Sequence, residues 1–321
     1  MTTYLVTGGA GFIGSHIMRR LVEKRKQDPS INIRVLDSLA TGFMYNVQPF
    51  IDSGDITFLK ADLNDENVVP VAVEGVDVIF HEAALASVPL SIEQPLTVHQ
   101  ACVSGTVHLL DCARKAGVQR VVYAASSSAY GDSPTPRKLE TECPGPISPY
   151  GAAKLAAELY LQAFAASYNI ETVRLRYFNV FGPRQDPKSP YSAVIPLFIT
   201  AMLNGRQPTI FGDGLQSRDF TFVSNIVDAN MLAAEAPAED VSGKVFNIAN
   251  GMSINLLMLV DTINEILGTH IKPIHAAPRV GDIRESVADI SQARKFLKFE
   301  PRVDLLEGLT KTVEFYRESP L

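Results

Sequence analysis

The sequence predicts an α/β fold in which a doubly wound parallel sheet is followed by a second, smaller mixed α/β domain. Two observations lead to this prediction. Short apolar runs alternate with helical patterns through the first half of the 321 residues, which is typical of βαβ units. From about residue 181 proline and glycine become frequent, as in "FGPRQDPKSPYSAVIP", which indicates a loop-rich C-terminal lobe.

The apolar runs give the order of the elements. We predict strands, with helices between them, at residues 3–8, 33–38, 56–61, 76–84, 120–126 and 172–179. A later apolar run predicts a strand at 244–250 that returns to the main sheet. The predicted domains are 1–180 with 220–250 for the main sheet, and 181–219 with 251–321 for the smaller lobe.

The stretch "GGAGFIG" joins the first predicted strand to the first helix. Its glycines, Gly8, Gly11 and Gly14, permit a tight turn and let a pyrophosphate approach the helix N-terminus, where unpaired N–H groups favour an anion. Asp37 ends the second predicted strand, 23 residues after Gly14, where a carboxylate accepts hydrogen bonds from an adenosine ribose. The first domain is therefore predicted to be a dinucleotide-binding Rossmann domain.

Two carboxylates bear on the identity of the dinucleotide. Asp37 would repel a 2′-phosphate, and no arginine or lysine stands at position 38, so NAD is favoured over NADP. Asp62 ends the third predicted strand and is placed to reach the adenine, although a helix N-cap is an equally good interpretation.

The segment "SPYGAAKLAAELYLQAF" predicts a helix whose first turns carry Tyr150 and Lys154. Because these residues are four apart, their side chains share one face. A tyrosine acts as a base only if its pKa falls from about 10 towards neutrality, which requires about 4 kcal/mol from its surroundings. The Lys154 ammonium and a cationic nicotinamide ring are the two charges expected to supply it.

Three serines follow the fifth predicted strand in "YAASSSAYGD". Residues at the carboxyl end of a parallel strand face the ligand crevice of doubly wound folds, so Ser126 is placed to exchange a proton with a substrate hydroxyl and with Tyr150. For Ser127 and Ser128, hydrogen bonding to the backbone at the strand end is an equally good interpretation.

Composition bounds the class of partner. The net charge of −6 and the pI of about 5.6 give no electrostatic signal for nucleic acid or an anionic membrane, so we expect a small-molecule partner. Cys102, Cys112 and Cys143 show no metal-type spacing, so no metal site is expected, and the odd count predicts a reducing compartment. The first predicted strand begins within three residues of Met1, so we expect no signal peptide and a cytoplasmic protein.

Taken together, the motifs resemble the extended short-chain dehydrogenase/reductase family. The resemblance rests on "TGGAGFIG", "HEAA", "SSSAYG" and "YGAAK". More narrowly, "AALASVPLSIEQP", "RYFNVFGPRQDP", "GDGLQSRDF" and "RVGDIRESVADIS" are similar to bacterial UDP-sugar 4-epimerases that act on N-acetylated hexoses. The resemblance implies tightly bound NAD, a UDP-sugar substrate and a homodimer formed through helices.

The resemblance also assigns roles to residues. It implies Tyr150 as base, Lys154 as the group that lowers its pKa, and Ser126 in the proton relay. The cofactor-binding positions that it implies are Gly8, Gly11, Phe12, Ile13, Gly14, Asp37, Asp62, Leu63, Ala83, Tyr150, Lys154 and Tyr177. The substrate-binding positions are Ser87, Ser126, Ser127, Tyr150, Asn179, Val194, Arg218, Arg279, Asp282 and Ser286.

Within this set, both arginines, Arg218 and Arg279, match positions that clamp the diphosphate. Asp282 matches one that holds the uridine ribose.

Position 286 indicates which sugars the substrate pocket accepts. In the family a bulky tyrosine there restricts the pocket to UDP-glucose and UDP-galactose, whereas Ser286 leaves room for a 2-acetamido group. Two departures weaken the narrower assignment: Cys102 stands where asparagine is usual, and Leu90 replaces an arginine common in the acetamido-sugar branch.

The residues after Ser126 separate related reactions. Sugar 4,6-dehydratases need an acid/base pair directly after the strand-end hydroxyl, and nucleotide-sugar decarboxylases need a glutamate nearby, but positions 127–129 hold Ser, Ser and Ala. We therefore expect C4 epimerisation of UDP-GlcNAc/UDP-GalNAc and UDP-Glc/UDP-Gal. The alternatives left open are a UDP-glucuronic acid 4-epimerase, a net dehydrogenase or 4-ketoreductase, and a non-catalytic NAD-binding protein.

Overall fold

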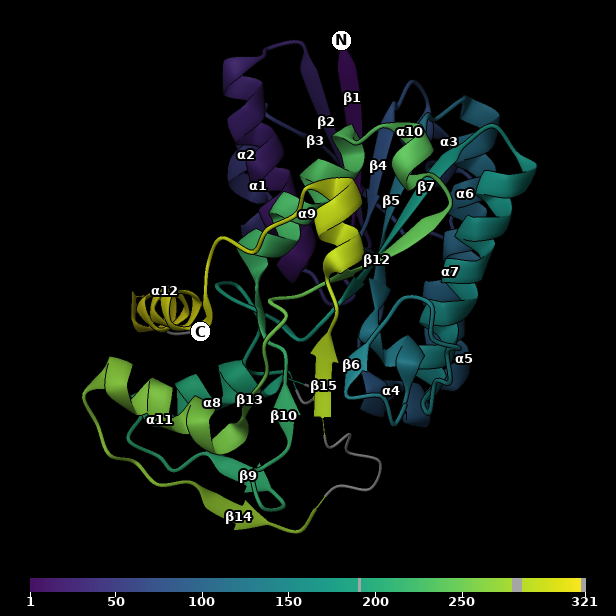
Figure 1. Ribbon diagram of the computed structural model, residues 1–321. Helices are drawn as coiled ribbons and strands as arrows, with labels where there is room; N and C mark the ends of the chain where they lie inside the picture. The colour runs from purple at the N-terminus through teal and green to yellow at the C-terminus, as the bar shows by residue number, and fades with distance from the viewer. Residues whose placement is uncertain (190–191, 279–284, 319–321) are drawn as a thin grey trace.

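A computed structural model describes residues 1–189, 192–278 and 285–318. Its main sheet has seven parallel strands in the order β12-β7-β5-β4-β1-β2-β3 (Figure 1). Their bounds are β1 (Thr2–Thr7), β2 (Ile31–Asp37), β3 (Thr57–Lys60), β4 (Val78–His81), β5 (Arg120–Ser126), β7 (Glu171–Tyr177) and β12 (Lys244–Ile248). Each of the seven predicted apolar runs overlaps one of these strands, and the predicted doubly wound parallel sheet is confirmed.

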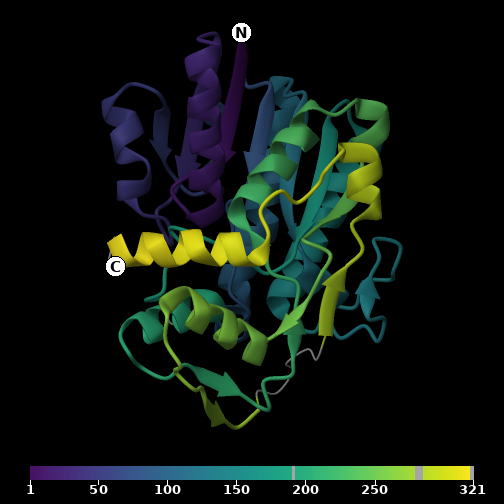
Figure 2. The same cartoon turned by 60° about the vertical axis from the view of Figure 1, so that its left-hand side comes forward.

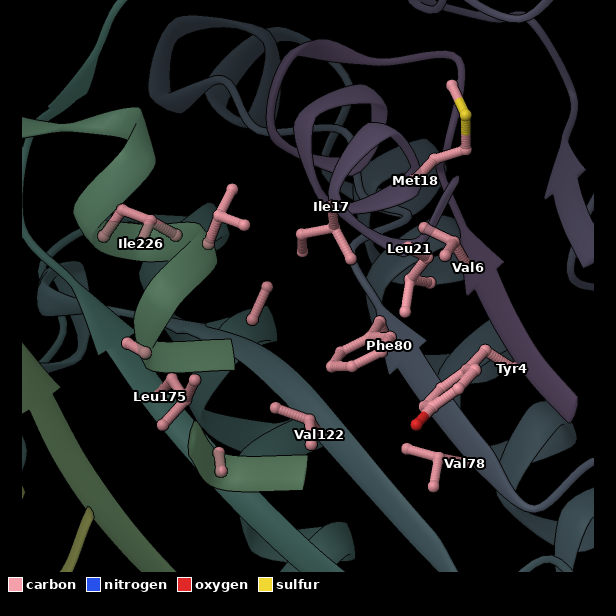
Figure 3. Packing of buried hydrophobic residues seen from close by; sticks show 14 of the residues in the cluster. Tyr4, Val6, Ile17, Met18, Leu21, Val78, Phe80, Val122, Leu175 and Ile226 are labelled. Atoms are coloured by element: carbon pink, nitrogen blue, oxygen red, sulfur yellow. The ribbon is translucent and has the colours of Figure 1, made fainter. Parts of the chain in front are cut away.

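Helices cover both faces of this sheet because its strands bury side chains on both sides. One face packs against α1 (Phe12–Gln27), α9 (Val223–Glu235) and the helical turn η4 (Ala293–Leu297). The other face packs against α3 (Val68–Val73), α6 (Gly105–Ala116) and α7 (Pro149–Ser167). In Figure 3, Ile17 and Leu21 of α1 and Ile226 of α9 lie over Phe80 of β4 and Leu175 of β7. These apolar contacts fix the helices on the sheet.

The smaller lobe lies below the carboxyl edge of the main sheet in Figure 1. Its core forms between α8 (Val194–Leu203), α11 (Leu256–Leu267) and α12 (Leu305–Glu318), and Figure 2 shows α12 crossing between the two lobes. Its sheet has the order β13-β10-β15-β6, with bounds β13 (Ile254–Asn255), β10 (Ser217–Arg218), β15 (Glu285–Ala288) and β6 (Arg137–Lys138). The predicted second, smaller domain is therefore present.

The remaining elements are short connections. Two strand pairs are β8 (Val180–Phe181) with β11 (Thr221–Phe222), and β9 (Thr209–Phe211) with β14 (Ile274–Ala276). The other helical segments are η1 (Met44–Asn46), α2 (Gln48–Asp52), α4 (Val88–Glu93), α5 (Pro95–His99), η2 (Gln100–Ser104), η3 (Ser127–Tyr130) and α10 (Ala238–Val241). Among all the residues that the structure describes, no helix is long and apolar enough to cross a membrane.

The chain returns to the main sheet late in the sequence. Ala293, Leu297 and Phe299 are buried in the same core as α1 and α9. The segment 293–299 thus packs on the first lobe although it follows β15 of the second. The exact domain boundaries stay a prediction.

Candidate active site

The glycine turn after β1 forms a cradle that side chains would fill. Gly8 has a φ of +70°, a left-handed conformation that favours glycine, and a Cβ there would lie 2.7 Å from the Ala83 nitrogen. A Cβ on Gly14 would lie 2.2 Å from the Gly8 carbonyl oxygen. Phe12 and Ile13 begin α1 and pack against the apolar core of the smaller lobe. The glycines therefore let the turn pack closely, and the N-terminus of α1 that follows it is where a phosphate group is expected.

Asp37, the last residue of β2, is held next to this turn. Its Oδ2 accepts a hydrogen bond from the Ala10 N–H at 2.9 Å, and its Oδ1 accepts one from the Leu39 N–H at 2.7 Å. These bonds orient the carboxylate toward the edge between β1 and β2, where an adenosine ribose is expected.

The third strand brings Asp62 and Leu63 to the same edge. Asp62 is exposed, and its Oδ1 accepts hydrogen bonds from Asn64. It does not cap α3, which begins at Val68 with Asn67 as its N-cap. Leu63 is buried and packs against α6, where a Cβ on Gly105 would lie 2.8 Å from the Leu63 Cβ.

Ser126, Tyr150 and Lys154 come together beside the carboxyl end of β5. Ser126 ends β5, and α7 begins after Ser148, whose Oγ accepts the Gly151 N–H at 3.1 Å as an N-cap. Lys154 is buried, and its Nζ lies 4.4 Å from the centre of the Tyr123 ring. The strand end and the first turns of the helix thus place the three predicted catalytic side chains at one point.

In the protein chain alone, burial is the main influence on the pKa of Tyr150 and raises it well above its usual value. Cys102 and Glu82 raise it further, whereas hydrogen bonding to Ser126 lowers it. Burial lowers the pKa of Lys154. Tyr150 is therefore neutral in the protein alone, and a positive charge brought by the cofactor would add to that of Lys154 in favouring its ionisation.

Two polar side chains at this edge, Glu82 and Asn230, were not singled out from the sequence, and both bind the predicted Tyr177. The Tyr177 hydroxyl, at the end of β7, donates to Glu82 Oε1 at 2.9 Å, and Asn230 Nδ2 donates to the Tyr177 oxygen at 2.8 Å. Glu82 follows β4 directly, and Asn230 lies on α9. The signal for Glu82 was an acidic residue placed directly after a buried strand in "HEAA".

Two predicted substrate residues are paired on the sheet of the second lobe. Arg218 of β10 and Ser286 of β15 are register partners on neighbouring parallel strands, and Ser286 is 9% exposed. Asp219, also unpredicted, is buried and accepts N–H bonds from Asn250, Gly251 and Ala288. Burial raises its pKa to about 7.

The remaining substrate positions are more dispersed. Asn179, with a φ of +32°, donates to the Asp219 carbonyl oxygen at 3.1 Å. Ser87 is the N-cap of α4, Val194 begins α8 and Ser127 begins η3. Arg279 and Asp282 lie outside the described residues.

Cys102 and Leu90, the two departures from the family pattern, lie against the catalytic helix. Both pack in the apolar cluster that contains Tyr150 and Ala153. Cys102 is 1% exposed and belongs to η2, a wider π-type turn between α5 and α6.

Comparison with known proteins decides the family. A family model described as "NAD dependent epimerase/dehydratase family" matches residues 4–249. The chain belongs to this family. It is 38% identical over 315 residues to a UDP-glucose 4-epimerase of Mycolicibacterium smegmatis, covering 98% of each chain.

Two solved structures of family members resemble the chain throughout. A UDP-N-acetylglucosamine 4-epimerase of Methanobrevibacter ruminantium M1 superposes with a TM-score of 0.92 at 40% identity, covering 99% of this chain and 98% of that one. A UDP-glucuronic acid 4-epimerase variant of Bacillus cereus, in complex with NAD and UDP-4-deoxy-4-fluoro-glucuronic acid, superposes with a TM-score of 0.90 at 28% identity, covering 99% of each.

As a member of this family the chain is an enzyme with NAD as its cofactor. The cradle fits that group: Gly8 and Gly14 let the turn pack tightly, Gly11 places no side chain at the N-terminus of α1, and Asp37 ends β2 beside this turn.

Proposed function

We propose that this enzyme inverts C4 of UDP-hexoses, with UDP-GlcNAc/UDP-GalNAc and UDP-Glc/UDP-Gal as its substrate pairs. The observation that carries the proposal is the convergence of Ser126, Tyr150 and Lys154 at the end of β5, in a chain that also has a dinucleotide cradle. Arg218 and Ser286 are paired on strands of the second lobe. The similarity to UDP-sugar 4-epimerases over the whole chain supports it.

The residues have distinct tasks in this reaction. Tyr150 takes the proton of the sugar 4-hydroxyl, with Ser126 relaying it, and Lys154 places a positive charge beside the phenolate. When bound, NAD would supply the reversible hydride-transfer chemistry that inversion at C4 needs, with no net oxidation of the sugar. Arg218, with Arg279 and Asp282, is proposed to hold the UDP part, which leaves the hexose free to turn over.

The residues that follow Ser126 argue against dehydration. Ser127, Ser128 and Ala129 form η3, and Ser128 Oγ donates to Ser126 Oγ at 2.7 Å. None of them is a carboxylic acid, and elimination of the 6-hydroxyl needs such an acid/base pair near the relay hydroxyl.

The test is to incubate the purified protein separately with UDP-GlcNAc, UDP-glucose and UDP-glucuronic acid and to resolve the products by NMR. We expect the C4 epimers of the first two and no accumulation of NADH. Epimerisation of UDP-glucuronic acid alone would favour the alternative suggested by the Bacillus cereus relative. NADH that accumulates in step with turnover would contradict the epimerase proposal.

Replacing Ser286 by Tyr is expected to suppress acetamido-sugar turnover selectively. Ser286 is 9% exposed and pairs in register with Arg218, so a phenol ring there would occupy volume beside the proposed sugar pocket. We expect kcat/KM for UDP-GlcNAc to fall at least about tenfold more than that for UDP-glucose, since one such pocket clash costs about 1–3 kcal/mol. Ser286→Ala is the matched control. Equal losses on both substrates would contradict the gate.

We propose a homodimer formed through α5 and α7. These helices pack side by side and expose Leu96 (78%), Leu159 (54%) and Tyr160 (45%). Leu159→Glu is expected to shift the protein from dimer to monomer in light scattering, because the charge would be buried at the interface. Leu306 is an exposed residue of α12, and Leu306→Glu should leave the mass measured by light scattering unchanged. A wild-type monomer would contradict this proposal.

A further inference from the structure

The carboxyl group of Glu82 lies at the carboxyl edge of the main sheet, where the cofactor is expected, and has no role in the mechanism above. This residue directly follows β4, which lies between β1, with its glycine turn, and β5, which ends at Ser126. Because the adenosine end of the dinucleotide is expected at β2 and the catalytic side chains at β5, the cofactor has to cross the end of β4. Ala83, next to Glu82, already lies against Gly8.

The Glu82 side chain is oriented by two neighbours. Asn230 is fully buried, and its Nδ2 donates to both the Ile226 carbonyl oxygen and the Tyr177 hydroxyl oxygen. The Tyr177 proton is therefore directed to Glu82 Oε1, at 2.9 Å. A carboxylate accepts more than one hydrogen bond, so Glu82 keeps lone pairs for a further partner while Tyr177 holds its orientation.

Groups from three elements, β7, α7 and β5, interact electrostatically with this carboxyl. Burial raises the pKa of Glu82 to about 7, while the Tyr177 hydrogen bond and the Lys154 ammonium lower it. Tyr150 of α7 and Tyr123 of β5 are close enough for Glu82 to raise the pKa of each.

The adjacent His81 adds no charge. Burial lowers the pKa of its imidazole to about 3. Thr106 donates to the Cys102 carbonyl oxygen and so accepts from His81 Nε2, while Thr7 binds His81 Nδ1 at 2.7 Å. A neutral imidazole satisfies this chain of bonds.

We propose that the ionised Glu82 carboxylate, oriented by Tyr177, faces the nicotinamide end of the cofactor and favours its oxidised form. The nicotinamide ring is positively charged in NAD⁺ and neutral in NADH. A nearby carboxylate therefore stabilises NAD⁺ selectively, and the partial burial of the site strengthens this interaction relative to water.

Proton binding follows from the same contact. A cation beside Glu82 lowers its pKa, so NAD⁺ binding near pH 7 releases protons, whereas NADH binding does not. The preference for NAD⁺ is complete above pH 7, where Glu82 is ionised, and is lost as the pH falls and the carboxyl becomes protonated.

The test measures the Kd values of cofactor-free protein for NAD⁺ and NADH between pH 5.5 and pH 8, with NADH fluorescence as the readout. We expect the ratio Kd(NADH)/Kd(NAD⁺) to rise about tenfold over this range, as for a displacement of one pKa unit. In Glu82→Gln the ratio should be lower at pH 8 and independent of pH. The control is Glu140→Gln, another carboxyl whose pKa is raised by burial; it binds the Asn247 N–H, and its replacement should leave the rise intact.

A second variant protects the test against a misfolded Glu82→Gln. Tyr177→Phe removes the hydrogen bond that lowers the Glu82 pKa, so the rise should move to higher pH. A wild-type ratio that does not change with pH, or one that changes identically in Glu82→Gln, would overturn the proposal. No sugar substrate is present, so the result is independent of the proposed substrate specificity.

Discussion

Replacing Tyr150 by Phe should abolish epimerisation while the fold and the bound NAD are retained. The substitution removes one hydroxyl from a side chain that packs with Ala153 and Cys102, so the apolar contacts remain. The lost hydroxyl is the proposed general base, and such catalysis contributes about 10²–10⁴-fold. We expect kcat to fall at least about a hundredfold, measured as conversion of UDP-GlcNAc by NMR.

Tyr168→Phe is the matched control because Tyr168 stands at the far end of the same helix and is 44% exposed. It should keep wild-type turnover. Retention of more than about a hundredth of the wild-type rate in Tyr150→Phe would refute the general-base assignment. Loss of bound NAD in that variant would instead give Tyr150 a role in cofactor binding.

The main sheet could be predicted because most of its strands are short apolar runs that are buried on both faces; the edge strand β3 is more exposed. Runs such as "RVVYAAS" carry this signal locally, and Ser126, Asp37 and the glycine turn follow from their positions at strand ends. Tyr150 and Lys154 share a helix, so their spacing alone predicts that they are neighbours.

Contacts between distant segments could not be predicted in this way. Glu82 and Tyr177 are 95 residues apart, and Asn230 is 53 residues beyond Tyr177, so no local pattern indicates that the three side chains meet. The pairing of β6 with β15 and the return of residues 293–299 to the main sheet could not be predicted for the same reason. Helical periodicity reveals an apolar face but not the surface that it covers.

A comparison of two glycines separates folding from cofactor binding. Gly14→Ala is expected to destabilise the protein even without NAD, because the added Cβ would lie 2.2 Å from the Gly8 carbonyl oxygen and 2.9 Å from the Gly9 Cα. Both neighbours are backbone atoms of a fixed turn. The cost of such overpacking, about 3 kcal/mol or more, exceeds the roughly 1 kcal/mol that alanine gains over glycine within a helix.

Gly11→Ala should behave differently at the same turn. Gly11 has a φ of −79°, which any residue adopts, and its Cβ would meet only the Gly8 oxygen, at 3.2 Å. We therefore expect the Tm of the cofactor-free protein to fall by about 6 °C or more for Gly14→Ala but to stay near the wild-type value for Gly11→Ala. The Kd for NAD should rise in both, since the methyl group added by Gly11→Ala would stand at the open N-terminus of α1, where a pyrophosphate approaches. Equal Tm losses in the two variants would mean that the whole turn is needed for folding, and wild-type NAD affinity in Gly11→Ala would place the pyrophosphate elsewhere.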